Sequence, residues 1–190
     1  ALTISESTNN IRREVVSELR RLPNVLSKQL LEDDGSYDKA IEILSVSDSA
    51  IFIGRGISYP LTMEGALKMM EVAYLPCLAY SGGELKHGPI ALIEEGTPVI
   101  AISPNDATKA LMESSIRECK SRGARIILVS DSEDSICELA DVVISTQTTH
   151  PDLSPIVNVI PLQIMAYKLA VHKGTNVDRP RNLAKSVTVV

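Results

Sequence analysis

The sequence predicts an α/β fold in which helices cover both faces of a parallel β-sheet. Short apolar runs alternate along the chain with segments of helical periodicity, and that alternation is typical of parallel sheets. The runs at 98–102, 125–129 and 142–144 are almost wholly apolar, as expected of strands that are buried on both faces. The 190 residues are enough to bury the core of one domain.

The first part of the chain is expected to form two helices. Apolar residues recur near the 3.6-residue period between residues 8 and 31, and Pro23 should kink or divide that helix. Residues 33–36 (Asp-Asp-Gly-Ser) form a break, after which a short amphipathic helix is predicted at 37–46.

The remaining chain is expected to alternate strands with helices. The predicted strands are 50–53, 77–80, 98–102, 125–129 and 142–144. The predicted helices are 61–74, 84–92, 109–121 and 153–173, the last of which could be interrupted at Pro155 and Pro161. No internal repeat and no linker divides the body, so a single domain is expected over residues 1–190.

Composition argues against several classes of partner. The net charge of −5 is unfavourable for contact with nucleic acid or a membrane, and the absence of Trp with only one Phe leaves little for base stacking. No uninterrupted apolar run approaches the ~18 residues that cross a bilayer. We therefore expect a cytoplasmic protein with no nucleic-acid and no membrane partner.

The cysteines and histidines lack the spacing of metal ligands. Cys77, Cys119 and Cys137 are an odd number of cysteines, which is typical of buried free thiols in a reducing cytoplasm. The three histidines are far apart in the sequence and form no ligand pair. No metal and no cofactor is expected.

Two segments have both a structural and a functional interpretation. Gly54-Arg55-Gly56 follows a strand but lacks the third glycine of a dinucleotide fingerprint, so it predicts a tight turn more than a nucleotide site. Glu64, Lys68 and Glu71 have the spacing i, i+4 and i+7, which places them on one helix face. That face could be a solvated row of ion pairs or a set of acid–base groups.

Three segments in order resemble the glucosamine-6-phosphate synthase family, the isomerising glutamine:fructose-6-phosphate aminotransferases. They are Gly54-Arg55-Gly56 followed by Glu64 to Lys68, Gly83 to Pro89 (GELKHGP), and Asp178 to Val189 (DRPRNLAKSVTV). The resemblance covers the chain from Leu22 onward and is to the second, C-terminal sugar isomerase (SIS) domain. It implies a three-layer α/β/α sandwich with a five-stranded parallel sheet.

The resemblance also implies roles for individual residues. Glu71 would be the base that carries a proton between C1 and C2 of the sugar, with Lys68 beside it. Lys185 would form a Schiff base with open-chain fructose 6-phosphate, because an iminium acidifies the adjacent C–H. His87 would help to open the sugar ring in the neighbouring subunit of a homodimer, and the backbone of Ala184 would contact the sugar.

The family comparison divides the chain into an N-terminal helical leader (1–48), an α/β body (49–175) and a C-terminal catalytic tail (176–190). Neither a glutaminase domain nor the first SIS domain with its phosphate-holding Ser/Thr loop is found. Residues 81–83 (Ser-Gly-Gly) are the nearest candidate for such a loop. We therefore expect the chain alone to be inactive with glutamine.

The leading interpretation is the C-terminal SIS domain of an enzyme of amino-sugar synthesis that converts fructose 6-phosphate to glucosamine 6-phosphate. Two alternatives stay open. One is a non-catalytic module for sugar-phosphate binding or dimerisation, and the other is a related deglycase that acts on amino-sugar derivatives. The pairing of Glu71 with Lys185 favours the synthetic enzyme, because a sensor needs neither group.

Overall fold

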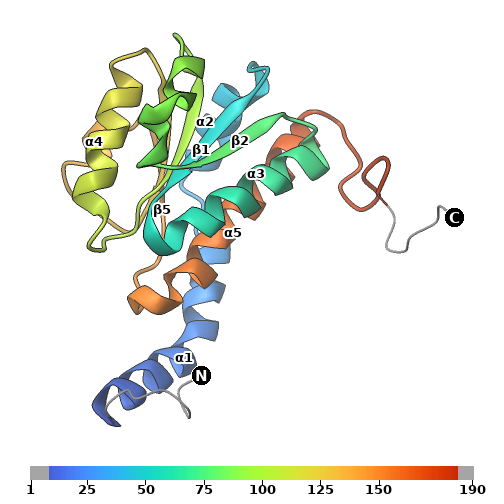
Figure 1. Cartoon of the computed structure of the whole chain (residues 1–190). Helices are drawn as coiled ribbons and strands as arrows, with labels where there is room; N and C mark the ends of the chain where they lie inside the picture. Colours follow the sequence, from blue (N-terminus) through green and yellow to red (C-terminus); the bar gives the residue numbers. More distant parts are fainter. Residues whose placement is uncertain (1–8, 184–190) are drawn as a thin grey trace, which may run out of the picture.

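In the computed structural model, which describes residues 9–183, five parallel strands form one sheet in the order β2-β1-β3-β4-β5 (Figure 1). The strands are β1 (Ala50–Gly54), β2 (Cys77–Ser81), β3 (Pro98–Ile102), β4 (Arg125–Ser130) and β5 (Val142–Ser145). The strand order reverses beside β1, so β1 and β3 flank the switch point of a doubly wound sheet.

Alternate residues of each strand enter two different hydrophobic clusters, as the two-residue period of a strand requires. Phe52 and Ile100 point to one face of the sheet, and Ile51 and Val99 point to the other. Strands β1 and β3 are buried along their whole length. Strand β5 is an edge strand in which Val142 and Ile144 are buried and Val143 is partly buried, so the expected burial is complete on one face of the sheet and partial on the other.

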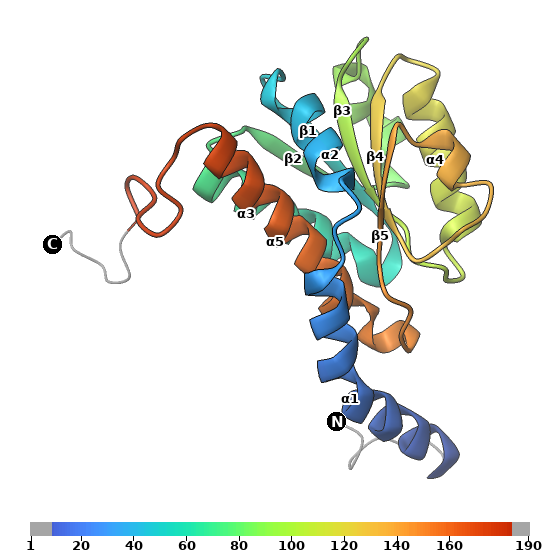
Figure 2. The ribbon, with the colours of Figure 1, turned by 180° about the vertical axis from the view of Figure 1, so that it is seen from behind.

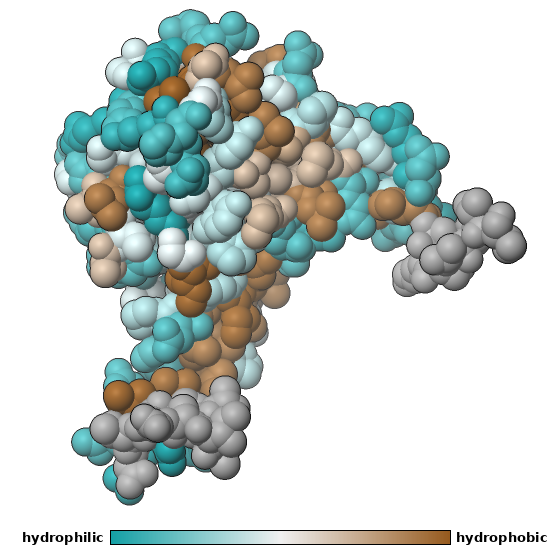
Figure 3. Space-filling view, viewed as in Figure 1, coloured by the Kyte–Doolittle hydropathy of each residue, from teal (hydrophilic) through white to brown (hydrophobic). Residues whose placement is uncertain are grey.

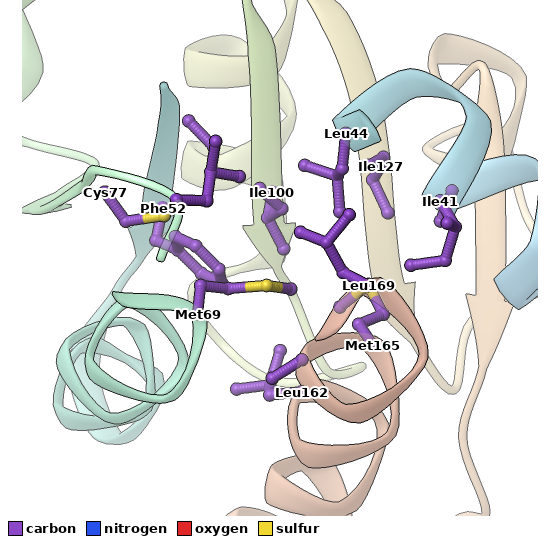
Figure 4. Close-up of a cluster of buried hydrophobic side chains, with 14 of the residues drawn as sticks. Ile41, Leu44, Phe52, Met69, Cys77, Ile100, Ile127, Leu162, Met165 and Leu169 are labelled. Atoms are coloured by element: carbon purple, nitrogen blue, oxygen red, sulfur yellow. The ribbon is translucent and has the colours of Figure 1, made fainter. Parts of the chain in front are cut away.

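Three helices cover one face of the sheet. They are α2 (Ser36–Ser45), α3 (Tyr59–Ala73) and α5 (Ser154–His172). Figure 4 shows Met69 of α3 and Leu169 of α5 among Phe52, Ile100 and Ile127 of the sheet. Helix α2 lies within the expected leader and packs against α5 and β5 in this core.

The opposite face is covered by α4 (Lys109–Lys120) and by the 3₁₀ turns that surround it. Figure 2 shows α4 on the far side of the sheet from α3 and α5. The predicted three-layer α/β/α sandwich with a five-stranded parallel sheet is confirmed.

One predicted helix has a different form. Residues 84–92 form two 3₁₀ turns, η2 (Glu84–His87) and η3 (Pro89–Leu92), where a single short helix was expected. Gly88 separates them with φ +142, a backbone conformation that ends any helix and that side chains rarely adopt.

Helix α5 is uninterrupted, although its two prolines were possible breaks. Pro155 lies in the first turn, where the missing N–H has no helical partner to lose. Pro161 lies within the helix and is buried, so tertiary packing offsets the lost hydrogen bond. By length and composition the segment Pro151–His172 could cross a membrane, but half of its most apolar window is buried against the rest of the fold.

Helix α1 (Asn9–Leu31) is one helix that passes through Pro23 and changes direction along its length (Figures 1 and 2). Its C-terminal end is fixed to the sheet by the amide of Gln29. The side-chain nitrogen donates to the carbonyl oxygen of Ser145 at 3.2 Å, and the side-chain oxygen accepts from the backbone N–H of Gln147 at 2.8 Å. The N-terminal turns reach away from the body.

Candidate active site

The turn between β1 and α3 places α3 against the sheet. A Cβ on Gly54 would lie 2.8 Å from the carbonyl oxygen of Ser58, and Gly56 has φ +53. Both glycines are therefore required by the backbone, which confirms the prediction of a tight turn. Helix α3 follows, with Pro60 in its first turn.

One face of α3 lies very close to strand β1. A Cβ on Gly65 would lie 2.8 Å from the Phe52 ring, so only glycine allows this approach. Because Gly65, Ala66 and Met69 are buried, residues 64, 68 and 71 are turned toward the outer side of the helix. The sequence spacing predicted this arrangement, and we call these three residues the α3 charged stripe.

The stripe is centred on Lys68. Its Nζ lies 2.5 Å from Oε2 of Glu71 and 3.7 Å from Oε1 of Glu64. The side chains of Lys68 and Glu71 are each 30% exposed, which leaves them accessible to a ligand. The hydrogen bond to Glu71 raises the pKa of Lys68 above its ordinary value, so Lys68 is held as an ammonium ion at neutral pH.

An apolar row runs beside the charged stripe. Met63, Leu67 and Met70 are all exposed, at the same i, i+4, i+7 spacing one position earlier. Figure 3 shows hydrophobic residues gathered over α3 and α1 on the face seen there. Exposed apolar rows of this kind are typical of surfaces that another domain or protomer covers.

His87 lies on the other side of the sheet. It ends η2, whose Leu85 is fully buried in the hydrophobic cluster beneath α4. The ion pair between Lys86 and Glu118 of α4, at 2.6 Å, also holds the turn there. His87 itself is exposed, and within residues 9–183 no hydrogen bond or ion pair joins it to the α3 charged stripe.

The loop that was the nearest candidate for a phosphate site is filled by an arginine. A Cβ on Gly82 would lie 3.2 Å from Nε of Arg55, and one on Gly83 would lie 3.3 Å from its Nη1. Nη2 of Arg55 donates to Oγ of Ser115 at 3.1 Å, and that hydroxyl is 3.1 Å from the carbonyl oxygen of Gly82. The guanidinium therefore supports the loop.

The sequence predicted the tight turn from the glycines on either side of Arg55, but it did not predict the contact of Arg55 with the loop at residues 81–83. The only signal was a charged residue between two turn glycines at the end of a buried strand. Ser115 gave no signal, because its partners are 33 and 60 residues away in the sequence.

The two predicted site residues of the tail, Ala184 and Lys185, lie outside the described residues. Cys77 and Cys119 are not candidate nucleophiles, because burial raises the pKa of each thiol to about 12. Cys137 is only partly buried, contrary to the expectation for all three. Among residues 9–183, no group of three or more His, Cys, Asp or Glu side chains could hold a metal ion.

Comparison with known proteins identifies the family. The family model described as SIS domain matches residues 43–173. The glutamine–fructose-6-phosphate aminotransferase (isomerizing) of Thermococcus kodakarensis is 43% identical over 189 residues, which cover all of this chain and 31% of the relative. The enzyme of that name from Tropheryma whipplei is 47% identical over 183 residues, covering 94% of this chain and 30% of the relative.

A solved structure agrees with these relatives. The C-terminal domain of glucosamine-fructose-6-phosphate aminotransferase from Francisella tularensis has a TM-score of 0.82 and 34% identity, covering 92% of this chain and 49% of that one. The chain spans about 30% of the length of the curated relatives named above. The chain therefore belongs to the SIS domain family and is homologous to the C-terminal SIS domain of the isomerising glutamine–fructose-6-phosphate aminotransferases.

Proposed function

We propose that this chain provides the sugar-isomerising groups of a glutamine–fructose-6-phosphate aminotransferase. The observation that carries the proposal is the pair of Lys68 and Glu71, 2.5 Å apart and partly exposed on the outer face of α3. The family resemblance assigns proton transfer to Glu71 and places Lys68 beside it. A carboxylate on a rigid helix that rests on the core is suited to that role.

The reaction divides between two residues. The amine of Lys185 attacks C2 of open-chain fructose 6-phosphate, and water leaves as the imine forms. Ammonia then displaces the lysine, so that nitrogen stays on C2. The carboxylate of Glu71 takes a proton from C1 and returns it to C2, while the proton of the C1 hydroxyl passes to the imine nitrogen, which leaves an aldehyde at C1 and an amine at C2.

The charge on Lys68 supports the assignment of imine formation to Lys185 and not to Lys68. An imine forms only from a neutral amine, and the hydrogen bond from Lys68 to Glu71 raises the pKa of Lys68. Lys68 is therefore poorly suited to covalent chemistry. As an ammonium ion it can hold the carboxylate of Glu71 in one position and neutralise charge that develops on the substrate oxygen.

The proposed site needs a second surface to be complete. Arg55 occupies the loop at residues 81–83, and in this proposal the substrate phosphate is held by groups outside that loop. The exposed apolar row beside the charged stripe is a suitable surface for another domain or protomer. We propose a cytoplasmic homodimer in which His87, exposed on the opposite side of the sheet, serves the site of the partner.

Covalent trapping tests the proposal. The protein as its gene encodes it is incubated with fructose 6-phosphate and borohydride, and the adduct is mapped by mass spectrometry. We expect the adduct on Lys185 and none after Lys185→Arg, because a guanidinium cannot form the imine. Glu71→Gln should still be trapped, while its rate of isomerisation should fall by roughly 10²–10⁴.

Two matched variants serve as controls. Lys173→Arg changes an exposed lysine at the end of α5, and Glu113→Gln changes a helical glutamate that is ion-paired with Arg117. Both should be trapped and turn over like the wild type. An adduct on Lys68 would show that Lys68, and not Lys185, forms the imine with the substrate. Absence of any adduct in the wild type would favour the alternative of a binding module.

A further inference from the structure

Arg55 connects three elements at the carboxyl end of the sheet. It follows β1 directly, beside the loop that follows β2. The N–H of Gly82 donates to the carbonyl oxygen of Gly54 at 2.9 Å, so the pairing of β1 with β2 continues into that loop. The guanidinium of Arg55 then donates to Ser115 of α4. Arg55 therefore joins the end of β1 to α4 across the loop.

The loop fits closely around the guanidinium. A Cβ on Gly82 would lie 3.0 Å from Sδ of Met112 and 3.2 Å from Nε of Arg55, and one on Gly83 would lie 3.3 Å from Nη1. Contacts this short leave little room for a side chain at either glycine. The course of the loop is therefore matched to the arginine that it surrounds.

Stability alone does not account for a charged group at this place. Nε of Arg55 is buried without a hydrogen-bond partner, and among residues 9–183 no carboxylate forms an ion pair with the guanidinium. A buried donor without a partner costs free energy, and an apolar side chain of similar length would avoid that cost. The rigid planar fork of the guanidinium instead gives the loop a fixed surface.

The supported loop leads directly into the turn that carries His87. Gly83 is the residue before η2, and His87 is the last residue of η2. Four residues separate them, which is about 8 Å along a 3₁₀ turn. The buried Leu85 and the pairing of Lys86 with α4 hold the turn itself. The contact of Arg55 with the loop sets the point from which that turn begins.

We propose that Arg55 is a positioning residue for His87: by holding the loop before η2 it sets where the imidazole is presented to the partner protomer. The inference rests on the proposed role of His87 in the site of the partner. Its physical basis is that a misplacement of a reacting group by about 1 Å can lower a rate by as much as 10². Arg55 acts only through His87 and contacts no substrate.

The kinetic test uses the protein as its gene encodes it. Arg55→Met keeps the length of the side chain and removes its donors, so kcat should fall by roughly 10- to 100-fold with KM nearly unchanged. Arg55→Lys keeps one donor for Ser115 and should recover part of kcat. Arg117→Met, at an exposed arginine of α4, is the matched control and should resemble the wild type.

Subunit mixing shows which group Arg55 acts through. Arg55→Met refolded 1:1 with Glu71→Gln should recover about a quarter of wild-type activity, because each mixed dimer has one site with an intact Glu71 and a correctly placed His87. Arg55→Met refolded with His87→Gln should recover nothing, because neither chain then presents a working histidine. A merely destabilised fold would not distinguish the two mixtures.

Hydrogen exchange followed by mass spectrometry needs no activity. In Arg55→Met the peptide that covers residues 82–88 should exchange about tenfold faster, because loss of the contact raises the population of the open loop. The peptide that covers residues 64–73 of α3 should exchange as in the wild type. Arg117→Met should change neither peptide, and thermal denaturation shows that each variant is folded.

The outcomes separate this inference from the proposed function. Unchanged exchange at 82–88, recovery with His87→Gln, or recovery with neither partner would overturn the positioning role alone. A rise in KM with unchanged kcat would do the same, because it would place Arg55 on the substrate. If Glu71→Gln mixed with His87→Gln recovers nothing, the proposed role of His87 in the partner is overturned, and this inference is overturned with it.

Discussion

Helix α3 and turn η2 hold their candidate site residues by different means. In α3 the regular spacing of the helix brings Lys68 to Glu71 and Glu64, and the closeness of Gly65 to the Phe52 ring fixes the helix on the sheet. In η2 nothing about the local sequence fixes His87. The turn is held by the burial of its Leu85 and by contacts with α4.

This difference in support decides which of the two regions finds its partners within a single chain. The α3 charged stripe is a complete ion-paired set, because its partners are neighbours on the same helix. His87 is presented to solvent, and on the described part of the chain it meets none of the stripe. A rigid turn that presents an exposed histidine is suited to a site formed with a second molecule.

The largest effect is expected when Glu71 and His87 are mutated in different protomers of one dimer. Glu71→Gln and His87→Gln should each abolish most of the isomerising activity when present alone. If His87 serves the partner, a 1:1 mixture of the two variants should recover about a quarter of wild-type activity, since half of the dimers are mixed and each has one intact site. Activity of subunits mixed by unfolding and refolding measures this.

If the mixture recovers no activity, His87 does not serve the site of the partner, because Glu71 and His87 would then belong to one site of one chain. The control carries an affinity tag on one variant only, because co-purification of the untagged variant from the refolded mixture shows that the subunits have exchanged. Sedimentation of the same samples shows that they are dimers.

The next effect concerns the stability of η2. Leu85→Ala should lower the free energy of unfolding by about 2–5 kcal/mol, because Leu85 is fully buried and leaves a cavity. Leu92→Ala, at an exposed leucine of η3, should cost less than about 0.5 kcal/mol. Urea denaturation measures both. Equal effects would mean that the turn is not anchored by its core residue.

A smaller effect is expected at Ser115. Ser115→Ala removes the hydroxyl that connects Arg55 to the carbonyl oxygen of Gly82, and should cost about 1 kcal/mol. The neighbouring Ser114→Ala removes an exposed hydroxyl of the same helix and should be nearly neutral. If Ser115→Ala is also neutral in chemical denaturation, the hydroxyl of Ser115 does not hold the loop before η2.

The smallest effect is the pH dependence of the α3 charged stripe. The pKa of Lys68 is raised in the folded protein by its hydrogen bond to Glu71. The resulting stabilisation is complete below the ordinary lysine pKa of 10.5 and is lost as pH rises through the higher folded value. Because the pair is partly exposed, the loss should be no more than about 1 kcal/mol.

Urea denaturation between pH 9 and 12 tests this in the wild type and in Lys68→Met. The variant should lack the alkaline decrement that the wild type shows. A decrement of equal size in both proteins would assign it to other titrating groups.

The sequence by itself determined most of the secondary structure and the local part of the site. The strand at 98–102 was predicted to its ends, and each of the others to within one residue, because a buried strand needs a continuous apolar run. That Glu64, Lys68 and Glu71 share one face of a helix followed from helical spacing alone. Each of these features depends on residues that are close together in the chain.

Only the tertiary structure decided the rest. The continuity of α5 through Pro161 depends on its burial against other elements, and the support of the loop before η2 depends on Arg55 and Ser115, which are 60 residues apart. The contact of Tyr74 with Arg181 joins residues 107 positions apart. Periodicity carries no information about such pairs, because it describes which face of an element is apolar and not which distant element will pack against it.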